Sequence, residues 1–335
     1  MELQLNPASF PAFRIHNDDA GYRAGIEDMR VDELSPGEVL IKVAYSSVNF
    51  KDALAGTGKG KILRQFPLNG GIDVAGYVAA SSDPKFKEGD QVLCTGCGLS
   101  EARDGGYAEY ARLESKWTIP LPTGLTLRES MALGTAGFTA ALSLFQMVRN
   151  GQTPEMGPIV VTGATGGVGS LAIDILTCAG FEAHAITGKV AQFDYLIGLG
   201  AKQCIARKEL YWGQRPLEAA RWAGAIDSIG GDMLAGLTRV IRPYGNIASC
   251  GLAASAELAT TVMPFILRGL SLLGVASAGT ARAIREQVWE HVASDWKPSH
   301  LADIAKREVA LADLPRVFDT MLAGGSLGRT VVKPG

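Results

Sequence analysis

The chain has 335 residues, of which 47% are hydrophobic and 20% charged, and its formal net charge at pH 7 is −2. This length and apolar content suit two globular domains, and the near-neutral charge argues against nucleic acid or an anionic membrane as a partner. No uninterrupted apolar run approaches the roughly 20 residues of a membrane span, and residues 1–6 lack a signal-peptide pattern. We therefore expect a soluble, cytoplasmic enzyme that acts on a small molecule.

The N-terminal third predicts a β-rich domain. Short apolar stretches at 39–45, 73–79, 89–94 and 105–111 are separated by Gly, Pro and Asp, which favours a partly open barrel. A helical pattern of apolar residues follows over 128–150. Asn150-Gly151 ends that pattern as a helix C-terminus should.

The five cysteines are scattered, and their odd number argues against a disulfide framework. Cys94-Thr-Gly-Cys97 has the spacing of half a structural zinc site, but such a site needs two further ligands, and no second Cys or His pair lies near it. The four histidines do not cluster either. We therefore expect no metal, and we interpret Cys94 and Cys97 as two ordinary cysteines at the end of a strand.

From residue 158 onward, strands and helices alternate. Strands are predicted at 159–162, 183–187, 202–205, 225–229, 245–250 and 270–275, with helices between them, which indicates a doubly wound parallel sheet. Beyond it come a helix at 281–293, a strand-like stretch at 304–309, a helix at 314–323 and a strand at 328–333. We expect this last strand to return to the N-terminal domain.

The first predicted strand of this sheet runs into a glycine-rich turn, Ile159-Val-Val-Thr-Gly-Ala-Thr-Gly-Gly-Val-Gly-Ser170, and then into an apolar helix. Such a turn lets backbone N–H groups approach a pyrophosphate at a helix N-terminus. The spacing departs from G-x-G-x-x-G because Ala164 takes the first glycine position. A plain turn with a glycine cap is the alternative, but the second strand at 183–187 favours a dinucleotide site.

The end of the second strand predicts which dinucleotide binds. NAD sites usually carry an acidic residue there, whereas this chain has Thr187-Gly188-Lys189. A hydroxyl and an ammonium would hold a 2′-phosphate that a carboxylate would repel. Tyr195 and Arg207 lie slightly further on and are expected to complete the pocket. The sequence therefore favours NADPH, although Lys189 alone is also consistent with a solvated surface lysine.

Several segments match one family in the same order and cover nearly the whole chain. They are Ser46-Ser-Val-Asn-Phe-Lys-Asp-Ala53, Gly71-Ile-Asp-Val-Ala-Gly76, Gly134-Thr-Ala-Gly-Phe-Thr-Ala140, Val161-Thr-Gly-Ala-Thr-Gly-Gly-Val-Gly169 and Pro264-Phe-Ile-Leu-Arg268. On these residues the chain resembles the zinc-independent medium-chain dehydrogenase/reductase family. Within it, Asn49-Phe-Lys-Asp-Ala-Leu54 with Gly58-Lys-Gly-Lys61, and Thr261-Val-Met-Pro-Phe-Ile-Leu-Arg268, are similar to the acrylyl-CoA reductase subgroup, whose members are often labelled quinone oxidoreductases.

This resemblance implies an α/β fold with a GroES-like substrate and catalytic domain over 1–128. A Rossmann NADP-binding domain over 129–275 and a segment over 276–335 that returns to the catalytic domain would follow, commonly in a homodimer. Two departures stand out. Asn69-Gly70-Gly71 replaces the usual Pro-Gly, so that loop is expected to be looser. The zinc-dependent branch has Gly-His-Glu and a ligand Cys where this chain has Gly71-Ile-Asp and Asn49-Phe-Lys-Asp, so zinc-based alcohol dehydrogenation is poorly supported.

The resemblance also implies a set of cofactor-binding residues by position. They are Phe50, Gly166, Gly167, Val168, Gly169, Ser170, Thr187, Gly188, Lys189, Arg207, Leu252, Ile266 and Ser277. The residue patterns independently support the phosphate loop and the 2′-phosphate pocket. Leu252, Ile266 and Ser277 depend on the resemblance alone, and ordinary loop or core positions are the alternative for them.

Without a metal to polarise a carbonyl, a hydride acceptor must already be electron-poor, as in an α,β-unsaturated thioester, an enone or a quinone. Hydride addition to the β-carbon leaves an enolate that needs hydrogen-bond donors, and the α-carbon then takes a proton. Asn49 and Lys51 are the expected donors, and Asp52 would orient Lys51 or belong to a proton path. In the alternative interpretation, Asp52 caps the helix that begins there and Lys51 is solvated.

A basic stretch follows this segment. Lys59, Lys61 and Arg64 would clamp the phosphates of a CoA substrate, or else form a solvated charge run. Three functions stay open: NADPH-dependent reduction of acrylyl-CoA to propionyl-CoA, reduction of quinones or enones, and NADPH binding without turnover. The basic stretch favours the first over the second, and the donors at Asn49 and Lys51 favour either enzyme over the third.

Overall fold

The computed structural model describes residues 9–335, and the chain divides into two compact units. Unit 1 contains the chain up to Thr135 together with 278–286 and 305–335, and unit 2 contains 136–277 and 287–304. The segment 276–335 therefore does not return to the first unit as one piece, because 287–304 join unit 2. The interpretation of residues 1–6 concerns residues outside the described range.

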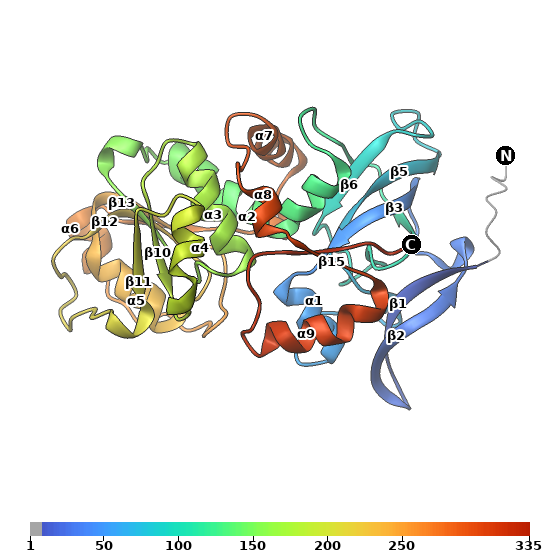
Figure 1. Ribbon diagram of the computed structural model, residues 1–335, viewed down its shortest axis with the longest axis horizontal. Coiled ribbons are helices and arrows are strands. Elements are labelled where there is room, and N and C mark those ends of the chain that lie inside the picture. Colours follow the sequence, from blue (N-terminus) through green and yellow to red (C-terminus); the bar gives the residue numbers. More distant parts are fainter. Residues whose placement is uncertain (1–8) are drawn as a thin grey trace. The chain divides into compact units, whose positions relative to one another are not determined.

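Unit 1 is built on a seven-stranded sheet, in which β3 pairs antiparallel with β5, β7 and β16 (Figure 1). Its strands are β3 (Val39–Ser47), β5 (Asp73–Ser81), β6 (Gln91–Thr95), β7 (Tyr110–Leu113), β8 (Ile119–Pro120), β15 (Arg307–Val309) and β16 (Thr330–Val332). The pairing of β16 with β3 confirms that the last predicted strand returns to the N-terminal sheet.

A smaller sheet in unit 1, with the order β2-β1-β4, was not predicted. It consists of β1 (Phe10–Asp18), β2 (Gly21–Met29) and β4 (Leu68–Asn69). Most residues of β2 are exposed, so its sequence lacks the alternation of apolar and polar residues that predicts a half-buried strand. The predicted strand at 105–111 was also too long, because regular pairing begins only at Tyr110.

Two helices of unit 1 pack together beside these sheets, namely α1 (Phe50–Thr57) and α9 (Leu314–Leu322), as Figure 1 shows. Phe318 lies in their shared apolar cluster with Ala53 and Leu314. Gly56 permits this close approach, because a Cβ at that position would lie 2.3 Å from the Phe318 ring. The packing fixes the helix that carries the predicted catalytic segment.

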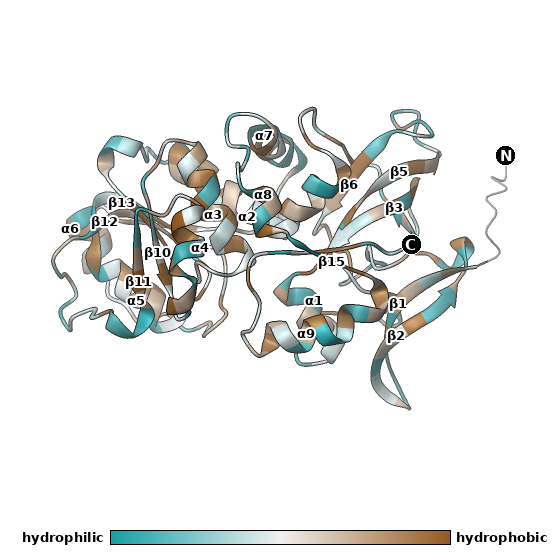
Figure 2. Ribbon diagram, viewed as in Figure 1, coloured by the Kyte–Doolittle hydropathy of each residue, from teal (hydrophilic) through white to brown (hydrophobic). Residues whose placement is uncertain are grey.

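Unit 2 contains a six-stranded, fully parallel sheet with the order β11-β10-β9-β12-β13-β14. Its strands are β9 (Ile159–Val161), β10 (Ala183–Thr187), β11 (Gln203–Ala206), β12 (Trp222–Asp227), β13 (Ile241–Ser249) and β14 (Ser271–Gly274). This arrangement confirms the predicted doubly wound sheet. Figure 2 shows how apolar its inner strands are, as expected for strands buried on both faces.

The helices between and after these strands are mostly short, and the last two lie beyond β14, with the first residues of α7 belonging to unit 1. They are α3 (Gly167–Cys178), α4 (Phe193–Gly198), α5 (Gly231–Val240), α6 (Met263–Arg268), α7 (Arg282–Ala293) and α8 (Leu301–Ile304). The strand order reverses between β9 and β12. Ligands of doubly wound sheets bind at such a switch point, beyond the carboxyl ends of the strands.

The longest helix, α2 (Leu127–Arg149), is long and apolar enough by length and composition to cross a membrane. Its most apolar window is 83% buried inside the protein, so the core already accounts for this apolar character. The sequence predicted one uninterrupted helix here. Gly134, with φ 51° and ψ −157°, breaks it instead.

Candidate functional site

The glycine-rich turn of unit 2 is as tight as its sequence implies. Helix α3 begins at Gly167, directly after the cap residue Gly166. A Cβ at Gly169 would lie 2.4 Å from the Gly163 carbonyl oxygen, and Gly163 itself has a φ of +59°. The left-handed backbone falls at Gly163, so Ala164 fits at the position where G-x-G-x-x-G has its first glycine. The first N–H groups of α3 have no acceptor within the helix, which makes this end suitable for a phosphate.

The turn after β10 brings the predicted 2′-phosphate residues together. Thr187 ends the strand, and its hydroxyl accepts a hydrogen bond from the Lys189 N–H at 3.0 Å. The Arg207 guanidinium lies about 3.4 Å from where a Cβ of Gly188 would be, so the missing side chain makes room for it. Arg207 is exposed and forms no ion pair with a carboxylate of residues 9–335. The turn therefore brings the Thr187 hydroxyl, the backbone of Lys189 and the Arg207 guanidinium together, and burial lowers the Lys189 pKa.

Tyr195 lies in α4, which follows both the phosphate loop and this turn in sequence. Its hydroxyl lies near Ser170 and is buried, yet it has no hydrogen-bond partner of good geometry in the described part of the chain. Burial also raises the Tyr195 pKa. A buried hydroxyl in this state fits a bound group that supplies the missing partner. The residues present thus fit a phosphorylated dinucleotide.

The other predicted cofactor residues lie on the surface rather than in the core. Phe50 in unit 1 is 46% exposed, and Leu252 and Ile266 in unit 2 are 66% and 73% exposed. Ser277 is half-buried at the start of a short 3₁₀ turn. Exposure excludes a core role for Leu252 and Ile266, and the assignment of all four to cofactor binding stays a prediction.

The predicted catalytic segment starts helix α1. The Asn49 N–H donates to Asp52 Oδ2 at 2.8 Å, which is the helix-capping contact of the alternative interpretation. The Ile72 N–H donates to Asp52 Oδ1 at 2.9 Å. Burial, together with the charge of Asp73, raises the Asp52 pKa to about 7 although these donors act to lower it. Asp52 can therefore hold a proton near neutral pH.

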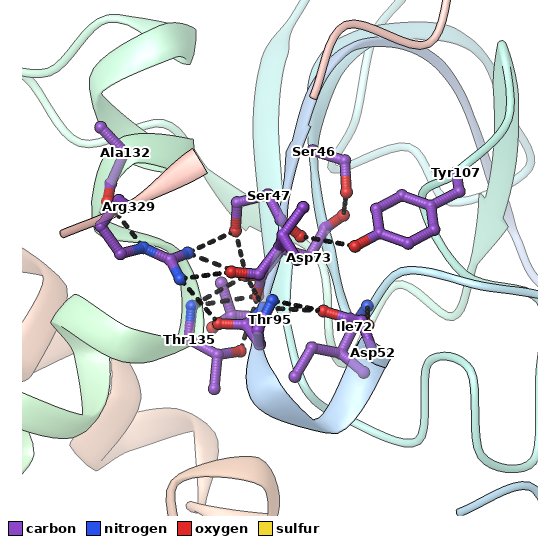
Figure 3. Close-up of polar contacts among 12 residues, drawn as sticks. Ser46, Ser47, Asp52, Ile72, Asp73, Thr95, Tyr107, Ala132, Thr135 and Arg329 are labelled. Atoms are coloured by element: carbon purple, nitrogen blue, oxygen red, sulfur yellow. Dashed lines mark hydrogen bonds and ion pairs between the residues drawn. The ribbon is translucent and has the colours of Figure 1, made fainter. Parts of the chain in front are cut away.

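Asp73, the first residue of β5, is the hub of a buried polar network (Figure 3). Its carboxylate accepts hydrogen bonds from the Ser47 hydroxyl, from Asn49 Nδ2 at 2.8 Å, and from the Thr135 hydroxyl at 2.6 Å. The Thr135 N–H also donates to both oxygens at 3.0 Å. This carboxylate thus ties β3, the start of α1 and the break in α2 to one point.

Arg329 supplies the buried positive charge of this network. Its Nη1 donates to the Val48 carbonyl at 2.7 Å and to Asn49 Oδ1 at 3.1 Å, and its Nη2 donates to the Ser47 hydroxyl at 2.6 Å. The nearest distance to the Asp73 carboxylate is 3.8 Å. Burial lowers the Arg329 pKa, while the charge of Asp73 opposes that effect.

The break in α2 makes room for the network. A Cβ at Gly134 would lie 2.5 Å from Ser47 Oγ and 2.6 Å from both Arg329 Nη2 and Asp73 Oδ2. The Gly134-Thr-Ala-Gly segment that carried part of the family resemblance therefore has a physical explanation. Glycine leaves space for three polar side chains, and Thr135 supplies two donors to one of them.

These contacts change the roles expected from sequence. The Asn49 amide donates to Asp73 and Asp52 and accepts from Arg329, so its polar atoms face the network. Lys51 forms an ion pair with Glu101 rather than being simply solvated. The geometry supports roles for Asn49 and Asp52 in positioning the start of α1. Lys51 is the half-exposed cation of this segment.

Sequence reasoning missed Asp73, Arg329 and Thr135 as members of one cluster. Arg329 and Val48 are 281 positions apart, a separation that no local pattern bridges. Asp73 did offer a signal, because it is the only charged residue in the apolar stretch from Gly71 to Ala80. A lone carboxylate at the start of a buried strand requires a buried partner.

The predicted CoA-binding stretch lies after α1. Lys59, Lys61 and Arg64 are all exposed. The Arg64 guanidinium lies 3.8 Å from Glu101, the same carboxylate that pairs with Lys51. This exposure is compatible both with phosphate binding and with a solvated charge run.

An open hollow of about 760 Å³ on unit 1 lies apart from the predicted residues. Its lining includes Lys42, Tyr45, Tyr77, Arg128 and Lys333, and no residue expected to act on substrate or cofactor belongs to it. Among residues 9–335, no group of three or more His, Cys, Asp or Glu side chains is arranged to hold a metal ion.

Comparison with known proteins identifies the family. Residues 35–123 match the family described as "Alcohol dehydrogenase GroES-like domain", and residues 167–294 match "Zinc-binding dehydrogenase". A Bacillus subtilis protein named "Putative quinone oxidoreductase YhfP" is 44% identical over 97% of this chain and 98% of its own length. This chain belongs to the medium-chain dehydrogenase/reductase family. The family assignment confirms the resemblance stated from the sequence, including the GroES-like and Rossmann-type units.

Further relatives of this medium-chain dehydrogenase/reductase carry more specific names. "Acrylyl-CoA reductase AcuI" of Ruegeria pomeroyi is 43% identical over 92% of this chain and 94% of its own length. The crystal structure of Escherichia coli YhdH with bound NADPH is 42% identical, covers 97% of this chain and 100% of that one, and has a TM-score of 0.93. Bacillus subtilis YhfP with bound NAD is 43% identical, with coverage of 98% and 100% and a TM-score of 0.94.

Proposed function

We propose that this chain is an NADPH-dependent oxidoreductase that reduces the activated C=C bond of a short α,β-unsaturated acyl-CoA, converting acrylyl-CoA to propionyl-CoA. The turn after β10 carries the cofactor part of the proposal, because it holds Lys189 two residues after Thr187 and Arg207 packed over Gly188, where an NAD site would have an acid. The relative named acrylyl-CoA reductase, at 43% identity, supports the substrate part.

NADPH, when bound, supplies a hydride to the β-carbon of the substrate. The residues of this chain bind and orient. The N-terminus of α3 would hold the pyrophosphate, Tyr195 would donate or accept one hydrogen bond at the edge of that loop, and Lys189 with Arg207 would neutralise the 2′-phosphate. One relative is recorded with NADPH and another with NAD. We propose that Lys189 and Arg207 decide between the two cofactors in this chain, because only NADPH carries the 2′-phosphate.

The substrate enolate needs a positive or hydrogen-bonding partner at its oxygen. We propose Lys51 for this role, since it is the cation nearest in sequence to the capped start of α1. Asn49 and Asp52 act by positioning, because their polar atoms already hold α1 against Asp73. Asp52 also holds a proton near pH 7 at a buried position, which suits a reservoir for protonation at the α-carbon.

Reduction of a quinone or enone is the second candidate. One observation favours it: Glu101 pairs with Lys51 and approaches Arg64, so part of the positive charge expected to attract a CoA phosphate is already neutralised. The Bacillus subtilis relative also carries a quinone oxidoreductase name. A non-catalytic NADPH-binding role is the third candidate.

The deciding measurement is the loss of 340 nm absorbance from NADPH in the presence of acrylyl-CoA, with NADH and 1,4-benzoquinone in parallel. We expect fast oxidation with acrylyl-CoA and NADPH and little with NADH. Turnover with quinone alone would reject the thioester and support the second candidate. Binding of NADPH without oxidation by any of these acceptors would support the third.

The basic stretch allows a sharper test of the CoA assignment. Lys59→Ala combined with Lys61→Ala should raise KM for acrylyl-CoA about tenfold, the loss of about 1.4 kcal/mol of phosphate binding, and leave kcat unchanged. KM for benzoquinone should not change. Lys85→Ala with Lys87→Ala, at two exposed lysines of another loop, is the matched control. Equal changes for both acceptors would assign Lys59 and Lys61 to the surface charge alone.

We also propose a homodimer and a cytoplasmic location. Helix α6 and Val262, the residue directly before it, carry exposed apolar side chains, with Val262 at 66% and Leu267 at 62% exposed. Exposed apolar patches of this kind mark interaction surfaces. The most apolar window of α2, the one described helix of spanning length, is 83% buried inside the protein, so this helix is accounted for as a core helix.

A further inference from the structure

The sequence interprets Cys94 and Cys97 as two ordinary cysteines at the end of a strand, and the structure brings their side chains together. Cys94 lies in β6, and Cys97 follows two residues after the strand ends. Three successive residues turn with positive φ, at 71° for Gly96, 53° for Cys97 and 83° for Gly98. This turn returns the Cys97 side chain to the same apolar cluster that contains Cys94.

The two thiols occupy one small, buried site. Cys94 is 1% exposed and Cys97 is 7% exposed. The Cys97 sulfur lies 3.5 Å from the carbonyl oxygen of Thr95, the residue next to Cys94. Neither cysteine is in a disulfide. A positive φ at a residue with a side chain is uncommon, so the turn holds Cys97 in a costly conformation that directs its sulfur inward.

The surroundings favour a thiolate at Cys97. Hydrogen bonding with the Cys94 thiol, together with the charges of Arg285 and Arg103, lowers the Cys97 pKa to about 7 despite burial. The Cys94 pKa is raised, through hydrogen bonding to Cys97, burial and the charge of Asp73. Arg285 is itself 1% exposed and donates to the Thr95 carbonyl at 2.8 Å, so its charge is fixed beside the pair. Cys97 is therefore the nucleophilic sulfur of the pair, and Cys94 is the thiol that can resolve its oxidised form.

We propose that Cys94 and Cys97 form a reversible disulfide, a redox-sensitive site that responds to a small peroxide. The Cys97 thiolate attacks one oxygen of hydrogen peroxide, the O–O bond breaks, and the leaving hydroxide takes up a proton to become water. The Cys94 sulfur, after losing its proton, attacks the resulting sulfenic sulfur. The S–O bond breaks and a second water leaves. The two thiols lose two electrons in total, and one peroxide is reduced to two waters.

The loop beyond Cys97 connects this site to the predicted catalytic helix. The Glu101 N–H donates to the Gly98 carbonyl at 3.1 Å, and the Arg64 N–H donates to the Glu101 carbonyl at 2.7 Å. The Glu101 carboxylate pairs with Lys51 of α1. Closing the disulfide requires the 96–98 turn to adjust, and Glu101 is three residues away. Oxidation therefore shifts the partner of Lys51.

Peptide mass spectrometry tests the proposal without any assay of turnover. The full-length protein is treated with hydrogen peroxide, its remaining thiols are alkylated, and the peptides are mapped. We expect the peptide containing Cys94 and Cys97 to lose about 2 Da and both alkylation sites, and dithiothreitol to restore them. The Cys178, Cys204 and Cys250 peptides should stay alkylatable. Two alkylatable thiols at 94 and 97 after treatment, or sulfinic acid at Cys97 without a bridge, would overturn the proposal.

Two variants distinguish the roles of the cysteines. Cys94→Ser should leave Cys97 as a sulfenic acid that dimedone labels, whereas Cys97→Ser should leave Cys94 unlabelled and without a bridge. Labelling of Cys94 in the second variant would reverse the assignment and contradict the argument from Arg285. Amide exchange should also rise across 96–103 and α1 in the oxidised wild type. Unchanged exchange there, with the disulfide formed, would reject the link to Lys51.

Discussion

Asp52 illustrates how one side chain takes both a structural and an acid–base character from its position. Three hydrogen bonds from Asn49 and Ile72 favour its charged form, but complete burial next to Asp73 outweighs them and raises the pKa to about 7. The folded protein therefore holds a proton that the unfolded chain releases near pH 4. This difference makes stability depend on pH.

Replacing Asp52 with Asn tests that dependence. The stabilisation from the extra proton is complete below about pH 4 and is lost as pH rises toward 7, with a slope of up to roughly 1.4 kcal/mol per pH unit. Asp52→Asn cannot ionise, so its free energy of unfolding should be lower overall, because one acceptor is lost, but flatter with pH. Urea unfolding between pH 4.5 and 7.5 measures both slopes. Asp19→Asn, at an exposed position, should keep the wild-type slope, and an equally steep slope in Asp52→Asn would contradict the assignment.

Gly134 gives a second prediction for a single residue. Its left-handed φ and the 2.5–2.6 Å approaches to Ser47, Asp73 and Arg329 leave no space for a methyl group. We expect Gly134→Ala to lower the free energy of unfolding by about 3 kcal/mol or more, because strain and a displaced buried charge combine. Gly198→Ala in helix α4, where a Cβ meets nothing within 4 Å, should instead be neutral or slightly stabilising. Equal thermal stabilities of the two variants would contradict this prediction, because they would show that the network accommodates the methyl group without loss of stability.

At the scale of elements, the turn that follows β10 connects local structure to cofactor choice. Strand β10 ends at Thr187, which leaves Gly188 and Lys189 at the carboxyl edge of the sheet with Arg207 packed over the glycine. Glycine and lysine thus work as a pair, since the first provides space for one cation and the second provides another.

Lys189→Ala should lower kcat/KM for NADPH by about 10- to 100-fold, the worth of one charge-assisted phosphate contact, and change kcat/KM for NADH little. Steady-state kinetics with both cofactors at a fixed acceptor concentration measure the ratio. Lys202→Ala, at an exposed lysine at the start of the next strand, serves as the control. A parallel loss with NADH and NADPH would mean that Lys189 contributes to folding or to the common part of the dinucleotide.

The elements also show what sequence patterns can and cannot predict. β3, β5, β6 and the six strands of unit 2 were found because they carry short apolar runs between glycines, which are densest in the buried strands β9 and β12. β2 was missed because little of it is buried, and the break in α2 was missed because Gly134 sits within an unbroken apolar period. The break leaves space for Ser47, Asp73 and Arg329, and residues so distant in sequence leave no local signal.

The predicted site divides in the same way. The phosphate loop and the Thr187–Lys189 turn are short segments whose chemistry depends on neighbours in sequence, so residue types and spacing were sufficient to propose them. The Asp73 hub joins side chains from β3, β5, α2 and the segment before β16, so spacing alone could not assemble it. Asn49 and Asp52 were proposed from the sequence as a donor and as a partner of Lys51, and those roles stay predictions, whereas their contacts with each other and with Asp73 depend on that hub.

At the scale of the whole molecule, the exposed apolar side chains of α6 and of Val262 before it predict the assembly state. Val262→Asp with Leu267→Asp would place two charges on this face without touching the core, since both side chains are more than 60% exposed. If the face joins two copies, the variant should sediment as a monomer while the wild type sediments as a dimer. Ile197→Asp, on an exposed residue of α4, should leave the wild-type state unchanged. A monomeric wild type would refute the homodimer outright.

The return of β16 to β3 also affects the order in which the protein can fold as it is synthesised. Arg329, which closes the network around Asp73, leaves the ribosome 281 residues after Val48, the residue whose carbonyl it binds. Until then the Asp73 carboxylate has no buried cation, and the sheet of unit 1 lacks its β16 neighbour. Most of unit 2 emerges earlier and has its parallel sheet complete by Gly274. The first residues made are thus among the last to reach their native structure, and a stalled or truncated nascent chain would expose an unfinished N-terminal sheet to aggregation.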